Sequence, residues 1–126
     1  MAAIHRLKID SDLLKANAVS PVLLQELFRT VDESISYEVE VAGGVTAAAL
    51  PGLGTADAAI ATIQTFVLIT DTSITLNWNG ANTSLVGGSG QRRAVFIAYG
   101  VSTATVPTVT NSGTGTAIVQ VMAGGT

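Results

Sequence analysis

The sequence of 126 residues contains no cysteine and a single histidine, His5. Without cysteine, the chain has neither a disulfide framework nor a thiolate metal site. One histidine cannot supply a histidine-based metal site or a Ser-His-Asp arrangement within one chain. Beyond residue 40 the only carboxylates are Asp57 and Asp71, whereas a glycosidase needs two that face each other across a groove. We therefore expect a protein that is not an enzyme and that requires no metal or cofactor.

Charge is also scarce, at 12% of the chain, which is about half of the usual share. The net charge of −3 leaves no basic surface to neutralise phosphates, so a nucleic-acid partner is not expected. No apolar run approaches the roughly 20 residues of a membrane span, and the first ten residues do not resemble a signal peptide. These absences predict a soluble protein with no membrane partner, made without an amino-terminal secretion signal.

The charges that are present are concentrated in the first 40 residues. Residues 41–126 contain only Asp57, Asp71, Arg92 and Arg93, and Thr, Ser, Asn, Gly and Ala take the place of the missing charges. A monomer of this size normally keeps a charged, mixed surface. The charge-poor region therefore favours a β surface that faces other protein, with a Thr- and Asn-rich domain of extracellular type as the alternative.

Residues 1–34 are expected to form an arm followed by one short α-helix over 21–32. Ser20 suits the helix cap and Pro21 the first helical position. Helical spacing places five apolar side chains on one face of this helix: Leu23, Leu24, Leu27, Phe28 and Val31. Docking of this face on the chain's own β domain is the favoured interpretation, and a partner-binding helix is the alternative.

The segment before that helix has two expected parts. Ser11 is a plausible cap for a helical turn over 12–19. In the first ten residues, Ile4, Leu7 and Ile9 belong to the run IHRLKI, whose alternation suits a strand added to the sheet edge of a neighbouring subunit. Contact with a neighbour is therefore predicted for this arm.

Residues 35–126 are expected to fold as one mainly β domain, a β-sandwich or jelly roll. Alternating apolar residues predict strands over 35–41 and 73–78, and Asn79-Gly80 suits the two-residue type I′ turn of a hairpin. The run QTFVLI at 64–69 is apolar on both sides, which is typical of a strand covered on both faces. Segment 45–50 is expected to pair with 35–41. Segment 55–64 suits either a short helix capped by Thr55 or strand-like alternation, and a loop or single turn leading into a strand is favoured. Further strands are expected at 94–101, at 105–110 as an edge because of Pro107, and at 116–122 after the NSGTG turn.

Three features of the β region have both a structural and a functional interpretation. Trp78 suits the core better than a sugar-binding platform because of the area it buries. Asp71, in TDTS, is best explained as a turn residue that bonds nearby backbone. Arg92 and Arg93 are equally compatible with contact to an acidic partner surface and with a solvated loop end.

The order of segments in the β region resembles the small β-sandwich proteins of tailed-bacteriophage particles. The resemblance covers roughly residues 64–125. It rests on FVLITDTSITLNWNG, a glycine-rich loop, AVFIAYGV and the closing TVTNSGTGTAIVQVMAGG. It implies a structural role in the virion, with assembly in the host cytoplasm, and it identifies no ligand residues.

The leading hypothesis is a capsid decoration or cement protein that contacts the major capsid protein or other virion subunits and forms a homo-oligomer, preferably a trimer. The alternative is a tail, baseplate or fibre component that contacts a receptor or glycan through residues 79–84 and 87–93. A free carbohydrate-binding module would need Trp78, Tyr37 or Tyr99 as an exposed platform. The candidate interface residues are Ile4, Leu7, Ile9, Thr75, Asn77, Asn79, Arg92 and Arg93.

Overall fold

The computed structural model describes residues 3–15, 18–87 and 93–126, with side chains described from Val31 onward. Regular structure in these residues consists of ten β-strands, and no helix occurs among them. The strands are β1 (Ala3–Lys15), β2 (Ala18–Val31), β3 (Glu33–Val41), β4 (Ala48–Ala49), β5 (Ile63–Thr70), β6 (Ile74–Trp78), β7 (Ala81–Leu85), β8 (Ala94–Thr103), β9 (Thr108–Thr110) and β10 (Ala117–Gly125). The mainly β class predicted from the sequence is confirmed.

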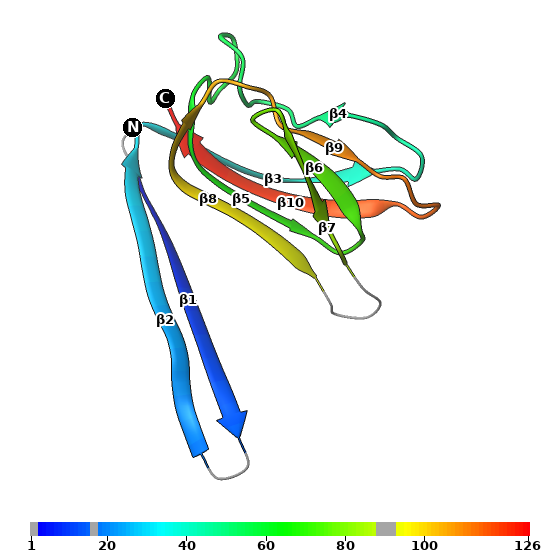
Figure 1. Cartoon of the computed structure of the whole chain (residues 1–126). Helices are drawn as coiled ribbons and strands as arrows, with labels where there is room; N and C mark the ends of the chain where they lie inside the picture. The colour runs from blue at the N-terminus through cyan, green and yellow to red at the C-terminus, as the bar shows by residue number, and fades with distance from the viewer. Residues whose placement is uncertain (1–2, 16–17, 88–92) are drawn as a thin grey trace.

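Two four-stranded antiparallel sheets lie face to face in a sandwich-like arrangement (Figure 1). The first sheet has the strand order β3-β10-β5-β8, and the second has the order β4-β9-β6-β7. The last strand, β10, lies inside the first sheet, where it pairs with β3 on one side and with β5 on the other. The first sheet therefore joins segments from both ends of the body.

The core lies between the sheets because side chains alternate across each strand. In β10, Val119 and Val121 are buried while Ile118 and Gln120 are exposed. The same alternation in β6 buries Ile74 and Leu76, as the period-2 pattern predicts. The largest fully buried side chain is Phe66 of β5.

The Asn79-Gly80 turn is confirmed as a two-residue hairpin turn. Trp78 pairs directly with Ala81 across it. Asn79 has φ 51° and Gly80 has φ 85°, and positive φ at both central residues is the property of a type I′ turn. The turn fixes the register between β6 and β7.

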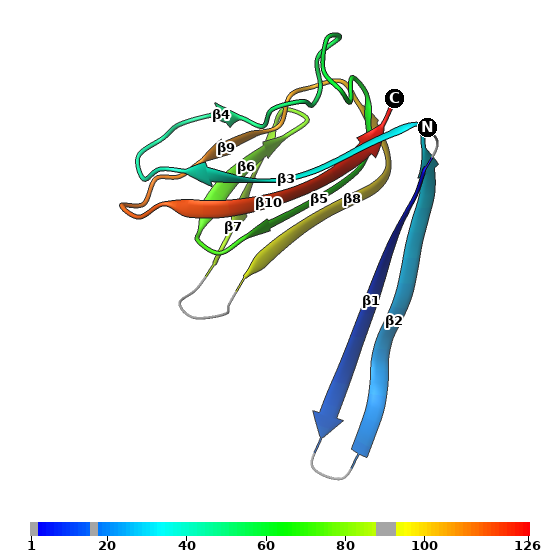
Figure 2. The ribbon, with the colours of Figure 1, turned by 180° about the vertical axis from the view of Figure 1, so that it is seen from behind.

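Residues 3–31 form a hairpin of their own, separate from the two sheets. β1 and β2 pair along their length, from Ala3 opposite Val31 to Lys15 opposite Ala18. Figure 2 shows this hairpin extending away from one end of the sandwich. At its base Val31 is 1% exposed, and the Asp32 backbone N–H donates to Gly125 O at 3.1 Å. The predicted boundary between residues 34 and 35 stays a prediction.

The helix predicted over 21–32 is wrong, and so is the helical turn over 12–19. Residues 18–31 form strand β2, and β1 continues to Lys15. The helical spacing of the leucines was a local signal, whereas β1 offers a pairing partner along the whole segment. Pro21 is tolerated because the register shifts beside it, between Ser11 and Asp12, and because a two-stranded ribbon has open edges.

The predicted pairing of 45–50 with 35–41 is also wrong. β4 pairs with β9, with Ala48 opposite Val109, while β3 pairs with β10. Ala47 has φ 52°, and its N–H donates to Thr110 Oγ1 at 2.9 Å, so the chain turns into the second sheet just before β4. The loop predicted over 55–64 is confirmed up to the start of β5 at Ile63, and it includes a turn closed by the Ala58 N–H to Thr55 O bond of 3.0 Å.

Candidate interaction surfaces

The described residues contain no cluster of three or more histidine and carboxylate side chains that suits a metal ion. They also contain no helix of the length and apolarity needed to cross a membrane. Asp71 acts as a turn residue, because its Oδ1 accepts from Thr72 Oγ1 at 2.9 Å and from the Ile118 N–H at 2.8 Å. This carboxylate therefore joins the β5–β6 turn to β10.

Two partly buried aromatic residues, Trp78 and Phe96, pack on the buried Phe66. Trp78 stacks on Phe66 with ring centroids 4.6 Å apart, and Phe96 lies 5.6 Å from the Trp78 ring. Trp78 thus packs against the core, as predicted, but is only partly buried. To serve as a sugar-binding platform, the Trp78 ring would have to give up its contacts with Phe66 and Phe96.

The second sheet has an outer face made of hydroxyl and amide groups. Thr75 and Asn77 of β6 lie on it, and Asn77 Nδ2 donates to Asn82 Oδ1 of β7 at 2.8 Å. Cross-strand pairing places further polar residues beside them: Ser84, Thr108 and Thr110. This polar face carries no charged residue, so water or an uncharged protein surface can cover it without burying an ion.

Asn79 does not belong to this polar face. It occupies the turn after β6, and its Oδ1 accepts from Thr103 Oγ1 at 2.9 Å. The side chain thus ties the β6–β7 turn to the end of β8, which is a strand of the other sheet. The turn role of Asn79 was predicted, but its bond to Thr103 was not apparent from the sequence.

The first sheet has a contrasting outer face that is largely apolar. Six apolar side chains of β5, β8 and β10 point away from the core cluster: Val67, Ile69, Val95, Ile97, Ile118 and Met122. Val95 is 49% exposed and Ile118 is 37% exposed. We call this surface the apolar face. The sequence analysis did not select these residues as interface candidates, although the two-sided apolar pattern of 64–69 was a signal for them.

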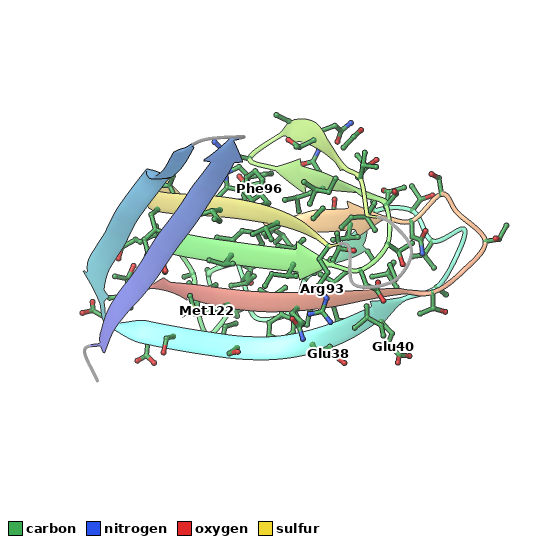
Figure 3. All side chains as sticks on the ribbon, turned by 90° about the horizontal axis from the view of Figure 1, so that it is seen from below. Glu38, Glu40, Arg93, Phe96 and Met122 are labelled. Carbon is green, nitrogen blue, oxygen red and sulfur yellow. The ribbon has the colours of Figure 1, made fainter. Side chains whose placement is uncertain are left out.

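Charged and polar groups border the apolar face along β3 (Figure 3). Glu38 and Glu40 are exposed there, and Gln120 Nε2 donates to Glu38 Oε2 at 3.3 Å. A groove of about 570 Å³ lies between this border and β5, lined by Glu38, Val67, Ile69 and Met122 among others. Arg93 lines a smaller hollow together with Glu38 and Asp71.

The predicted interface residues are therefore divided among different surfaces. Thr75 and Asn77 lie on the polar face, whereas Arg93 lies on the opposite side of the sandwich beside the apolar face. Ile4, Leu7 and Ile9 occupy β1, opposite Thr30, Leu27 and Gln25 of β2. Arg92 lies outside the described residues. The strand predicted for the first ten residues is present, but its partner is β2 of the same chain.

Tyr37 of β3 and Tyr99 of β8 are both half-buried. Burial raises the pKa of Tyr37 to about 12, and its hydroxyl donates to Pro51 O at 2.9 Å. Burial also raises the pKa of Tyr99, which pairs with Thr65 on the outer side of β8. Both phenols stay neutral at physiological pH and serve packing.

One buried polar residue, Asn111, was predicted only as part of a turn. It is fully buried, and its Nδ2 donates to Val41 O at 2.9 Å and to Gly115 O at 2.8 Å. Its Oδ1 accepts from the Gly113 N–H at 3.1 Å. Asn111 thereby holds the loop between β9 and β10 against the end of β3.

Comparison with protein-family models, curated proteins and solved structures found no match for this chain.

Proposed function

We propose that this protein is a structural subunit of a tailed-bacteriophage particle, acting as a capsid decoration or cement protein on a lattice of major capsid protein. The observation that carries the proposal is the nature of the two outer faces, one apolar and one polar but uncharged. A freely soluble monomer rarely presents a contiguous apolar face of this kind. The resemblance of residues 64–125 to small virion β-sandwich proteins supports the same role.

A glycan-contacting tail component has less support from the described side chains. Trp78 is partly buried and packs against the core cluster, and the Tyr37 hydroxyl is bonded to Pro51 O. Asn79, at the tip that such a component would use, is bonded to Thr103. The groups best suited to bind a sugar are thus engaged within the sandwich.

The test is to locate the chain on phage particles. Antibody labelling of particles that contain the protein should decorate the head surface, and particles that lack it should lose their DNA more readily on heating or osmotic shock. If the label is confined to the tail, and particles without the protein adsorb poorly to the host, the protein is a tail component and not a decoration protein. Absence of the chain from purified particles would contradict both.

A further inference from the structure

We propose that the apolar face binds the β1–β2 hairpin of a second copy of this chain. This inference deepens the proposed assembly role, on which it rests for the expectation that many copies meet on one particle. It assigns a partner to the apolar face, where Val95 and Ile118 are exposed and Val67 is 9% exposed. It also gives the hairpin a binding site that its own chain does not supply.

Covering the apolar face by another protein surface would be favourable for the same reason as burial in a core, because apolar side chains leave water. Each large apolar side chain moved out of water contributes roughly 1.5 to 3 kcal/mol when it is fully buried. Val95 and Ile118, on two different strands, remain 49% and 37% exposed with the whole chain present. Between them β5 is apolar on both sides, a pattern typical of strands that are covered on both faces.

The hairpin of the same chain is held away from this position. Its base is fixed by the buried Val31 side chain and by the bond from the Asp32 N–H to Gly125 O. Figure 3 shows the hairpin crossing only one end of the first sheet, while Arg93 and Glu38 lie towards the other end. The middle of the apolar face is left to another molecule.

The hairpin of a second copy matches the apolar face in length and in charge. A strand of 13 residues, such as β1, spans about 43 Å, which exceeds the length of each strand of the first sheet. Residues 4–9 of β1 include Arg6 and Lys8 and no acidic residue, whereas Asp10 and Asp12 follow in the same strand and Glu26 of β2 pairs with Lys8. The border of the apolar face carries the exposed carboxylates Glu38 and Glu40. Opposite charges therefore meet when residues 4–9 of β1 lie beside Glu38 and Glu40.

Disulfide trapping tests this placement, because the natural chain has no cysteine. One variant carries Ile118→Cys on the apolar face. A second variant, lengthened by a mass tag, carries either Leu7→Cys or Lys8→Cys in β1. Successive positions of a strand belong to opposite faces, so the two variants together test both ways in which the hairpin can dock. After mixing and mild oxidation, we expect a mixed disulfide at least tenfold above that formed with Ser84→Cys, the matched control on the polar face.

Three results would overturn the proposal. One is a mixed disulfide no more abundant than that of the Ser84→Cys control with both hairpin variants. Another is an intramolecular disulfide, at the mass of one chain, in Leu7→Cys/Ile118→Cys, because it would make the chain's own hairpin the occupant. The double variant Val95→Asp/Ile118→Asp is expected to shift from oligomer to monomer without a change in its circular dichroism spectrum. The control Ser84→Asp is expected to sediment like the natural chain. The last refuting result is therefore sedimentation of the double variant that is the same as that of the natural chain.

These measurements use purified protein alone, so they are separate from the test on particles. If the mixed disulfide forms but the protein is not found on particles, the decoration role is refuted and the docking of the hairpin on a second copy is supported. If the protein is found on the particle head but the mixed disulfide does not form, the decoration role is supported and the docking of the hairpin on a second copy is refuted.

Discussion

Replacement of Asn111 by alanine gives the sharpest test of how the sandwich is held together. The side chain is fully buried and makes three hydrogen bonds, to Val41 O, Gly115 O and the Gly113 N–H. Alanine removes all three bonds and leaves the buried Val41 O without this partner, together with Gly115 O and the Gly113 N–H at the part-buried edge of the site. A net hydrogen bond contributes about 1 kcal/mol, and an unsatisfied buried group costs about 1 to 3 kcal/mol.

We therefore expect Asn111→Ala to lower the free energy of unfolding by about 3 kcal/mol, since some of these groups will regain water when the loop relaxes. Against a typical total of about 5 to 15 kcal/mol, this is a large loss, and it corresponds to a fall in melting temperature of roughly 10 °C. Urea and thermal unfolding, followed by circular dichroism, measure both quantities.

Asn82→Ala is the matched control. Its amide oxygen also accepts a hydrogen bond, from Asn77 Nδ2 at 2.8 Å, but Asn82 is exposed on the polar face. Water can replace that bond, so the expected loss is about 0.5 kcal/mol. Equal losses in the two variants would refute the reasoning, because the argument relies on Asn111 being buried with three hydrogen bonds and Asn82 being exposed with one.

Three further predictions concern the body of the protein. Gly80→Ala should cost about 1 kcal/mol because Gly80 has φ 85°, whereas Gly115→Ala, also in open space, should be nearly neutral; equal unfolding midpoints would contradict this. Leu76→Ala should cost about 2 to 5 kcal/mol from a fully buried site, against about 0.5 kcal/mol for Thr75→Ala on the polar face, as measured by urea unfolding. The pKa of Tyr37 is about 12 in the folded state and near 10.0 when unfolded, so the unfolded chain releases this proton first and the free energy of unfolding should fall as pH rises from 10 to 12. An absorbance titration in which both tyrosines of the folded protein ionise near pH 10 would contradict that assignment.

The strands that could be predicted are those whose alternation is set by a single buried face. Residues 35–41, 73–78 and 116–122 alternate cleanly, and each contributes its apolar side chains to the core. The Asn79-Gly80 turn could also be predicted, because positive φ strongly restricts which residues fit. In these places the local pattern and the tertiary environment favour the same structure.

Long-range pairing could not be predicted from the same patterns. Nothing local in 35–41 identifies β10 as its partner, and the adjacent segment 45–50 was the natural but incorrect choice. The leucines of 23–27 fit a helix when taken alone, and only the presence of β1 as a partner makes them part of a strand. The apolar face was missed because its residues are spread over β5, β8 and β10, which become neighbours only in the folded sheet.

The central position of β10 has a consequence for the order of folding. β10 is the last strand of the chain, yet it lies between β3 and β5. While the chain is still being synthesised, β3 and β5 have no strand between them, and each exposes an unpaired edge. The first sheet can close only after residues 117–125 have left the ribosome, and contacts between such distant segments form slowly. Chains that stop before residue 117 should therefore be open to aggregation or to capture by chaperones.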